Sequence, residues 1–149
     1  MNLPRDIDAW QRGFVTRSAA ETERAGEALA GLIPADTALL LHGDLGAGKT
    51  TFARGFARGL GIAGDITSPS FALLNVHRGD RQLLHVDAYR LTDPAQLDSL
   101  LLDEILTTPW NLLLEWPERI RGREPAGAWT LRIENAGEHD RRLILSVSV

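Results

Sequence analysis

The first part of the chain alternates between helix-like and strand-like patterns. Ser18 and Glu21 have the spacing of a helix capping box, and apolar residues follow at helical spacing until Pro34 ends the segment. Residues 38–42 form a short, mostly apolar run, which is typical of a strand buried on both faces. After a glycine-rich loop, residues 49–60 have a helical pattern that ends at glycines. This order predicts a strand, a loop and a helix in direct succession.

The middle of the chain predicts a pair of strands joined by a turn, then a helix and a further strand. Residues 71–76 and 83–86 are strand-like, and the Arg-Gly-Asp-Arg segment between them fits a hairpin turn. Residues 111–114 are mostly apolar and predict a second buried strand. Asp93 and Pro94 predict the start of a helix whose apolar face contains Leu97, Leu100, Leu101 and Ile105.

The two ends of the chain differ in character. Residues 129–133 and 143–149 alternate apolar and polar positions on either side of a turn, which predicts a closing antiparallel pair of strands. Residues 1–17 have a mixed pattern, and we expect a lead-in arm that is flexible or used for docking. Residues 18–149 are expected to form a single α/β domain, with helices covering a mixed parallel and antiparallel sheet.

Composition and charge narrow the function classes. The chain has 149 residues and a formal net charge of −4, so tight unaided binding to the phosphates of DNA or RNA is disfavoured. The absence of cysteine excludes a disulfide framework, a cysteine-ligated metal site and a thiol nucleophile. The longest aliphatic run, residues 38–41, is far too short to cross a bilayer, and the N-terminus has no signal-peptide stretch. We therefore expect a cytoplasmic protein without membrane association.

The glycine-rich loop carries the strongest chemical signal in the sequence. Residues 43–50 match the pattern G-x-x-x-x-G-K-[ST], known as Walker A or the P-loop, at every fixed position. Such a loop folds around a polyphosphate so that backbone N–H groups and the start of the next helix face its oxygens. Lys49 would reach the β- and γ-phosphates, the Thr50 hydroxyl would coordinate Mg²⁺, and Thr51 could contact the α-phosphate. The pattern predicts a P-loop NTPase-like three-layer fold that binds a nucleoside triphosphate.

The basic residues sharpen this prediction. Lys49 is the only lysine among the sixteen basic residues of the chain. A compact ammonium fits inside a phosphate cradle, where the planar guanidinium of arginine is no equivalent substitute. A chain with one lysine cannot also contain the Asn-Lys-x-Asp motif that reads guanine, which favours ATP over GTP.

A P-loop site also needs an acidic group near Mg²⁺, usually at the end of another buried strand. Glu115 and Asp87 each end such an apolar run, so either carboxylate could orient the attacking water. His85 lies two residues before Asp87, so both face the same side of a strand and the imidazole is a candidate to orient that acid. The hydroxyl-rich residues 67–70 fit either a switch-like loop or an ordinary turn.

Together, four segments in this order resemble the bacterial TsaE family: residues 43–51, 67–71, 85–91 and 113–119. The resemblance extends from about Ser18 to the C-terminus. It implies a small P-loop ATPase with a mixed sheet, using ATP and Mg²⁺. It also implies action with TsaB and TsaD in making threonylcarbamoyladenosine beside the tRNA anticodon, with tRNA reached only through these partners.

The resemblance assigns roles to single residues as well. By position, Thr50 and Glu115 would hold Mg²⁺, and Asp87 would be a second acid near the γ-phosphate. Trp116 would belong to a functional surface, and Arg141 would border the nucleotide, as would the start of the first long helix near Ala19 and Glu21. The residues expected to be catalytic are Lys49, Asp87 and Glu115. The residues expected to bind the nucleotide are Asp44, Leu45, Gly46, Ala47, Gly48, Lys49, Thr50, Thr51, Thr67, Ser68, Asp87 and Arg141.

Two other functions are compatible with a P-loop in a chain of this size. A small-molecule kinase would need an acceptor pocket and an arginine-rich lid, for which Arg119, Arg121 and Arg123 are candidates. A non-enzymatic switch would bind ATP or ADP and dock on partner proteins. Because the sequence identifies no arginine finger, an ATPase of this kind is expected to be slow alone and faster when a partner completes the site.

Overall fold

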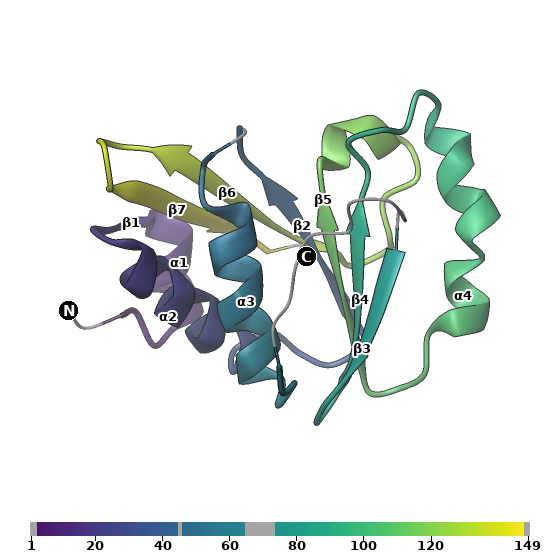
Figure 1. Ribbon diagram of the computed structural model, residues 1–149, viewed down its shortest axis with the longest axis horizontal. Coiled ribbons are helices and arrows are strands. Elements are labelled where there is room, and N and C mark those ends of the chain that lie inside the picture. Colours follow the sequence, from purple (N-terminus) through teal and green to yellow (C-terminus); the bar gives the residue numbers. More distant parts are fainter. Residues whose placement is uncertain (1–2, 45, 65–73, 148–149) are drawn as a thin grey trace.

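The computed structural model describes residues 3–44, 46–64 and 74–147. Within these residues, seven strands form one sheet in the order β1-β7-β6-β2-β5-β4-β3 (Figure 1). The strands are β1 (Phe14–Thr16), β2 (Thr37–His42), β3 (Leu74–Arg78), β4 (Gln82–Asp87), β5 (Trp110–Glu115), β6 (Trp129–Asn135) and β7 (Arg141–Ser146). The buried strands and the closing hairpin predicted from the sequence are therefore confirmed, while residues 71–73 of the predicted first strand lie outside the described residues.

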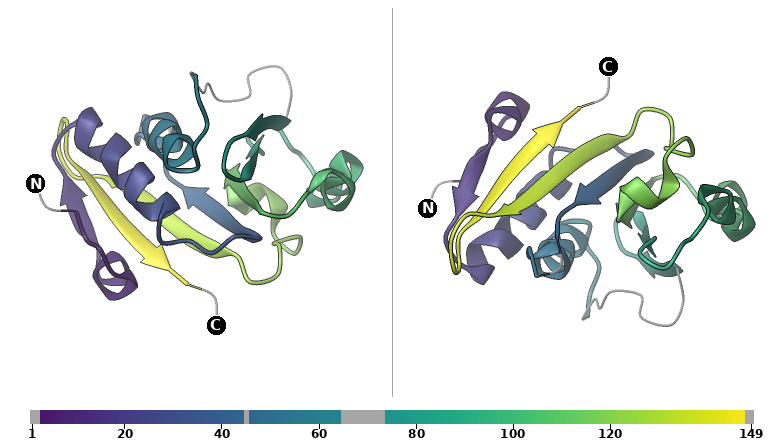
Figure 2. Two further views of the ribbon diagram at one scale, coloured as in Figure 1. Left: turned by 90° about the horizontal axis from the view of Figure 1, so that it is seen from below. Right: turned by 90° about the horizontal axis from the view of Figure 1, so that it is seen from above.

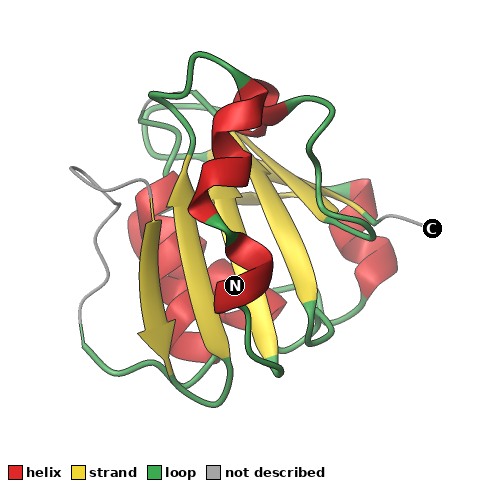
Figure 3. Ribbon diagram, turned by 90° about the vertical axis from the view of Figure 1, so that its right-hand side faces the viewer, coloured by secondary structure: helices red, strands yellow, loops and turns green. Residues whose placement is uncertain are grey.

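Helices cover both faces of this sheet. The helical elements are α1 (Ile7–Arg12), α2 (Ala19–Ala30), α3 (Lys49–Gly59), α4 (Leu102–Ile105) and the 3₁₀ helices η1 (Pro94–Leu100) and η2 (Pro117–Ile120). Helices α2 and α3 pack side by side on one face, and η1 and α4 lie on the opposite face (Figures 2 and 3). No helix in the described ranges is long and apolar enough to cross a lipid bilayer.

The alternation of side chains along β2 explains the three layers. Leu39 and Leu41 point to the core under α2 and α3, whereas Leu40 points to the second core under η1. Both neighbours of β2 are parallel to it, and strands of that kind bury both of their faces. The predicted three-layer α/β fold with a mixed sheet is confirmed, because β6, β2, β5 and β4 run parallel and the flanking pairs are antiparallel.

The parallel strands bring their carboxyl ends to one edge of the sheet. Strand β2 ends at His42, directly before the P-loop, and is paired with β5 so that Leu41 lies opposite Glu115. Strand β5 is paired with β4 so that Asp87 also lies opposite Glu115. The register therefore places both candidate acids beside the loop, as is usual for ligand sites of open α/β sheets.

The close crossing of α2 and α3 fixes the direction of the helix that follows the P-loop. A Cβ atom built on Gly55 would lie 1.7 Å from the carbonyl oxygen of Glu23, and one on Gly26 would lie 2.2 Å from that of Phe52. Only glycine leaves room for the two backbones at these points. The helices then bury Leu29, Phe52 and Phe56 completely in the shared core. The predicted capping of α2 is also confirmed, because the Ser18 hydroxyl accepts a hydrogen bond from the backbone N–H of Glu21 (3.2 Å).

The N-terminal segment, expected to be a flexible or docking arm, packs against the domain from residue 3 onward. Trp10 is completely buried, and its indole N–H donates to the carbonyl oxygen of Pro4 (3.1 Å). Strand β1 pairs antiparallel with β7, with Phe14 opposite Leu143. The segment is attached to the edge of the sheet because Trp10 is buried and β1 pairs with β7.

The helix predicted from Asp93 to Ile105 is interrupted. Asp93 and Gln96 form a capping box at its start, but the segment continues as the 3₁₀ helix η1. Residues i and i+3 of a 3₁₀ helix share a face, so Leu97 and Leu100 face the core together and Leu101 does not. Leu101 has a positive φ of 53°, is 56% exposed and separates η1 from α4, so its predicted place on the apolar face is wrong.

Candidate functional site

The loop between β2 and α3 contains the glycines of the predicted phosphate-binding pattern. Gly46 and Gly48 have φ values of 80° and 97°, in the region that favours glycine, and helix α3 starts directly after Gly48. Among the described residues no side chain caps α3, and the N–H groups at the start of a helix point outward, where they favour an anion. Leu45 lies outside the described residues.

Lys49 is held inside this loop by its surroundings. Its side chain is buried, and Nζ donates to the carbonyl oxygen of Gly43 at 2.6 Å. The same nitrogen lies 3.6 Å from the centroid of the Trp116 ring, which is a cation–π contact. Burial lowers the pKa of Lys49, and the nearby carboxylates of Glu115 and Asp87 oppose that effect. The ammonium is therefore partly desolvated, and its electrostatic attraction for a bound anion would be stronger than in bulk water.

Glu115 and Asp87 occupy the strand ends that the sequence predicted. Glu115 is buried, at 4% exposure, and Asp87 is half-buried on the strand directly beside it. A carboxylate oxygen of Asp87 accepts a hydrogen bond from the backbone N–H of Tyr89 (3.0 Å), which fixes the turn after β4. Two carboxylates of different burial thus lie next to the lysine.

In the described part of the chain, the hydrogen-bond partner of His85 is Glu115 and not Asp87, which we had expected. Its Nε2 lies 2.6 Å from Oε2 of Glu115, and both side chains are buried. His85 and Asp87 do share a face of β4, but Glu115 points to the same face from the neighbouring strand. The diagonal position across two parallel strands makes Glu115, not Asp87, the partner of the imidazole.

One cleft of about 470 Å³ gathers most of the predicted site residues. Its lining consists of Gly46, Gly48, Lys49, Thr50, Thr51, Asp87, Tyr89, Glu115, Trp116 and Arg141. Asp44 and Ala47 instead line a neighbouring cleft of about 540 Å³ on the other side of Trp116. Thr67 and Ser68 lie outside the described residues, so the structure does not place them.

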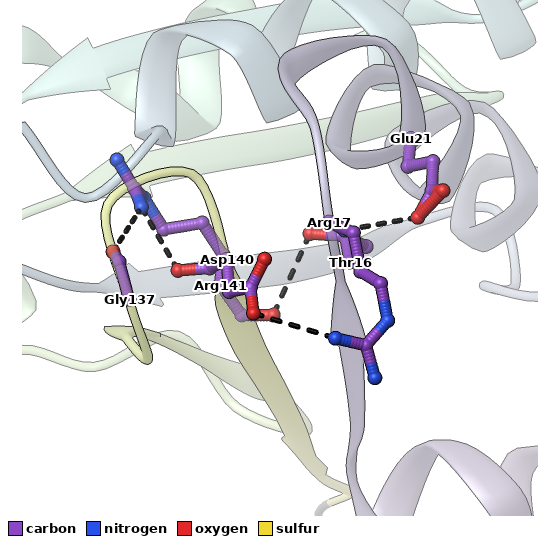
Figure 4. A network of polar contacts seen from close by, with 6 residues as sticks. All are labelled: Thr16, Arg17, Glu21, Gly137, Asp140 and Arg141. Carbon is purple, nitrogen blue, oxygen red and sulfur yellow. Dashed lines mark hydrogen bonds and ion pairs between the residues drawn. The ribbon is translucent and has the colours of Figure 1, made fainter.

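Arg141 connects the P-loop with the β6–β7 hairpin. Its guanidinium donates to the carbonyl oxygens of Gly137 (3.3 Å) and Asp140 (2.8 Å) in the hairpin, as Figure 4 shows. The second guanidinium nitrogen donates to the carbonyl oxygen of Gly46 (3.3 Å). Arg141 therefore lies beside the loop. The family resemblance predicts that this residue borders the nucleotide.

The start of α2 lies beside the same loop. Ala19 and Thr22 line a small recess of about 100 Å³ together with Gly48, Thr51, His139 and Arg141. Glu21, expected near the nucleotide, instead accepts a hydrogen bond from the backbone N–H of Arg17 (2.9 Å; Figure 4). Thr22 is a residue that the sequence analysis missed, because a buried threonine in a helix carries no recognisable pattern.

An aromatic pair forms the outer wall of the cleft. Trp116 directly follows β5, has a positive φ of 61° and precedes Pro117. Its ring lies 4.9 Å from that of Tyr89, and the Arg119 guanidinium lies 5.6 Å from the Tyr89 ring centroid. The role of Tyr89 was not predicted, although it lies two residues after Asp87 in one of the motif segments.

The donor set of the cleft suits a magnesium ion that is bound together with phosphate. Within the described residues, no group of three or more His, Asp or Glu side chains could hold a metal ion by itself. Thr50 and Glu115 supply one hydroxyl and one carboxylate to the cleft. Mg²⁺ prefers oxygen ligands and is usually held by one or two protein groups plus substrate phosphates, which fits this set.

Comparison with known proteins gives a consistent picture. The family model described as "Threonylcarbamoyl adenosine biosynthesis protein TsaE" matches residues 16–144. A relative from Treponema pallidum, named tRNA threonylcarbamoyladenosine biosynthesis protein TsaE, is 34% identical over 132 residues, covering 89% of this chain and 98% of the relative. A Bacillus subtilis relative of the same name is 36% identical over 129 residues, covering 86% of this chain and 80% of its own.

A solved structure agrees with these sequence matches. The crystal structure of YdiB from Bacillus subtilis superposes with a TM-score of 0.72 at 32% sequence identity, covering 91% of this chain and 85% of that one. The family model covers the P-loop, both strand-end acids and most of the closing hairpin. The chain therefore belongs to the TsaE family, whose members are named for tRNA threonylcarbamoyladenosine biosynthesis.

Proposed function

We propose that this chain binds ATP with Mg²⁺ at the P-loop and hydrolyses it, acting with TsaB and TsaD in the threonylcarbamoyl modification of tRNA. The observation that carries the proposal is the convergence of Lys49, Thr50, Asp87 and Glu115 on one cleft. The names of the relatives support the biological setting, since they refer to tRNA threonylcarbamoyladenosine biosynthesis. The net charge of −4 favours contact with tRNA through partner proteins and not directly.

Each residue of the cleft would have a separate role toward the phosphates, Mg²⁺ or water. Lys49 would exchange the Gly43 carbonyl for the β- and γ-phosphate oxygens, and the backbone N–H groups at the start of α3 would bind the same anion. Thr50 and Glu115 would hold Mg²⁺, which when bound supplies positive charge against the phosphate oxygens. Asp87 would accept a hydrogen bond from the attacking water and orient it.

The recess at the start of α2 is the proposed place for the adenosine end of the nucleotide. It shares Gly48, Thr51 and Arg141 with the main cleft, so the two form a continuous path along the P-loop. In this arrangement Thr51 and Arg141 would lie between the α-phosphate and the base. The proposal predicts that residues at the start of α2 affect nucleotide affinity more than the rate of hydrolysis.

Hydrolysis is favoured over transfer to a metabolite by the positions of the three arginines considered for a kinase lid. Within the described residues, none of Arg119, Arg121 and Arg123 lines the cleft. Arg123 lies 3.3 Å from the carboxylate of Asp98, on the side of η1. Arg141, the arginine that does line the cleft, donates to four backbone carbonyl oxygens, so the free chain is expected to turn over slowly.

The test is phosphate release by the purified chain with and without TsaB and TsaD. We expect ATP hydrolysis that the partners stimulate, and a loss of about 100-fold in Asp87→Ala and Glu115→Ala. Asp98→Ala is the matched control, because it removes an exposed carboxylate that does not line the cleft. Phosphate transfer to an added metabolite would support a kinase instead, and ATP binding without any phosphate release would support a switch.

A further inference from the structure

We propose that His85 is a positioning residue for Glu115, acting through a hydrogen bond from Nε2 to Oε2. This inference rests on the proposed function, because it concerns the carboxylate that would hold Mg²⁺. The imidazole itself does not line the cleft. Its role would be to fix the direction in which the Glu115 carboxylate faces the metal.

The geometry of the pair supports this role. The Nε2–Oε2 distance is 2.6 Å, and the side chains of His85 and Glu115 are 0% and 5% exposed. In the register of β4 and β5, His85 lies opposite Leu113, and Asp87 lies opposite Glu115. His85 therefore lies two residues before the position opposite Glu115, on the same face of the sheet. Long side chains at such diagonal positions can reach each other. The contact joins a fully buried strand position to the edge where the cleft opens.

The bond has a defined direction. An ionised carboxylate only accepts hydrogen bonds, so the proton between the two groups belongs to Nε2 of His85. The other ring nitrogen, Nδ1, is buried and has no hydrogen-bond partner in the described part of the chain. A proton on Nδ1 would leave a buried donor unpaired, which is costly. The arrangement thus places a ring proton on Nε2, directed at the Glu115 carboxylate.

This arrangement matters because of what surrounds Glu115. Asp87 lies opposite it on β4, and Lys49 is near enough for its ammonium to interact with the carboxylate. Without the His85 donor, the buried carboxylate would lose one of the contacts that set its orientation, and it could turn toward Lys49 and compete with the phosphates for the ammonium. A hydrogen-bonded ligand behind the metal keeps its orientation, and loss of such partners typically costs about 10- to 100-fold in metal affinity or activity.

The test compares His85→Leu with His85→Gln, whose amide N–H can replace Nε2 as the donor. We expect His85→Leu to raise the Mg²⁺ concentration for half-maximal ATP binding and hydrolysis about 10- to 100-fold. Nucleotide affinity measured with EDTA should change by less than about threefold, since only the metal ligand is affected. In His85→Gln, the Mg²⁺ concentration for half-maximal binding and hydrolysis should return close to the wild-type value. His77→Leu is the matched control, because His77 is a half-buried imidazole on the neighbouring β3 without a hydrogen bond to Glu115 in the described contacts.

A second measurement does not depend on nucleotide or metal. Nitrogen NMR of the metal-free wild type should show a proton on Nε2 of His85. Glu115→Leu removes the acceptor of that proton, so the preference for Nε2 should be lost in this variant. An Nδ1-protonated ring would overturn the inference, as would a normal Mg²⁺ dependence in a folded His85→Leu. If His85→Leu fails to fold, a His85→Gln protein that needs about 10- to 100-fold more Mg²⁺ than the wild type overturns the inference, and a Mg²⁺ requirement close to that of the wild type supports it. A wild type with no Mg²⁺-dependent ATP binding would instead overturn the proposed function.

Discussion

The ammonium nitrogen of Lys49 lies 3.6 Å from the centroid of the Trp116 ring and donates at the same time to the carbonyl oxygen of Gly43. Both partners belong to the protein, and together they fix where the ammonium lies beside the loop. Trp116 is held there by a left-handed backbone with φ of 61° and by its contact with Tyr89. The contact links the P-loop directly to the end of β5, where Glu115 lies.

Replacing Lys49 with methionine is expected to weaken nucleotide binding strongly without harming the fold. The loss of charged hydrogen bonds to phosphate corresponds to about 1.5–3 kcal/mol, or roughly 10- to 150-fold in affinity for ATP. The free energy of unfolding should stay equal or rise, because burial of the ammonium is unfavourable and lowers its pKa. Calorimetric titration with ATP and urea unfolding of the same samples measure both effects.

The control for this variant is Arg58→Met, which removes an exposed positive charge from the last turn of the same helix. It should leave ATP affinity unchanged. Equal losses of affinity in Lys49→Met and Arg58→Met would mean that general charge, and not the P-loop lysine, attracts the nucleotide.

Arg141→Ala is expected to weaken ATP binding. Arg141 lines both the cleft and the recess, and it holds the Gly46 carbonyl of the P-loop to the β6–β7 hairpin. Loss of these contacts would leave the loop less ordered, and the affinity should fall about 5- to 10-fold, as expected when about 1 kcal/mol of hydrogen bonding is lost. Arg142→Ala changes the next, exposed residue of β7 and should bind ATP like the wild type. Equal affinities for all three proteins in the titration would remove Arg141 from the site.

The P-loop part of the site could be predicted from the sequence because it is local. The strand before residue 43, the glycines at 46 and 48 and the helix after Lys49 are continuous in the chain, and each has its own pattern. The strand ends at Asp87 and Glu115 were also predictable, since apolar runs ending in an acid are visible in the sequence.

The contacts between distant segments could not be predicted in the same way. The partner of His85 depends on β4 lying next to β5, and the spacing of residues along the chain does not predict the order of strands in the sheet. The pairing of β1 with β7 joins Phe14 to Leu143 across nearly the whole chain. The break at Leu101 depends on the choice between a 3₁₀ and an α-helix, which the apolar pattern of residues 97–105 did not distinguish.

Gly55→Ala is expected to destabilise the protein strongly. The added Cβ would lie 1.7 Å from the Glu23 carbonyl oxygen, so α2 and α3 would have to move apart. Overpacking of this kind costs about 1–3 kcal/mol or more, measured as the free energy of unfolding in urea. Gly31→Ala is the control, because Gly31 has φ of −79° and its Cβ would meet only the Ala28 carbonyl oxygen at 3.5 Å. That variant should be neutral or more stable by up to about 1 kcal/mol, and a Gly55→Ala protein of equal stability would contradict the packing described for α2 and α3.

Stability should fall as the solution becomes acidic, in part because of His77. Burial and the neighbouring His85 both lower the pKa of His77 below its ordinary value of 6.5. As pH falls through 6.5, the unfolded chain therefore takes up a proton before the folded protein does, and the free energy of unfolding decreases. Above that pH both states are neutral at this residue and the contribution is fully present.

The variant His77→Gln should show a shallower decrease in unfolding free energy between about pH 7.5 and 5.5. His139→Gln should keep the wild-type slope, because the His139 side chain is 75% exposed. A steeper slope in His77→Gln would reverse the sign assigned to this residue. Urea unfolding at each pH provides the comparison.

The most direct test of the account is a crystal structure with Mg²⁺ and a non-hydrolysable ATP analogue. We predict that the β- and γ-phosphates occupy the loop at the start of α3, with Lys49 Nζ bonded to their oxygens in place of the Gly43 carbonyl. Mg²⁺ should lie between Thr50 and Glu115. A nucleotide bound away from this loop, or a Lys49 that still donates to Gly43 with the nucleotide present, would contradict the central claim.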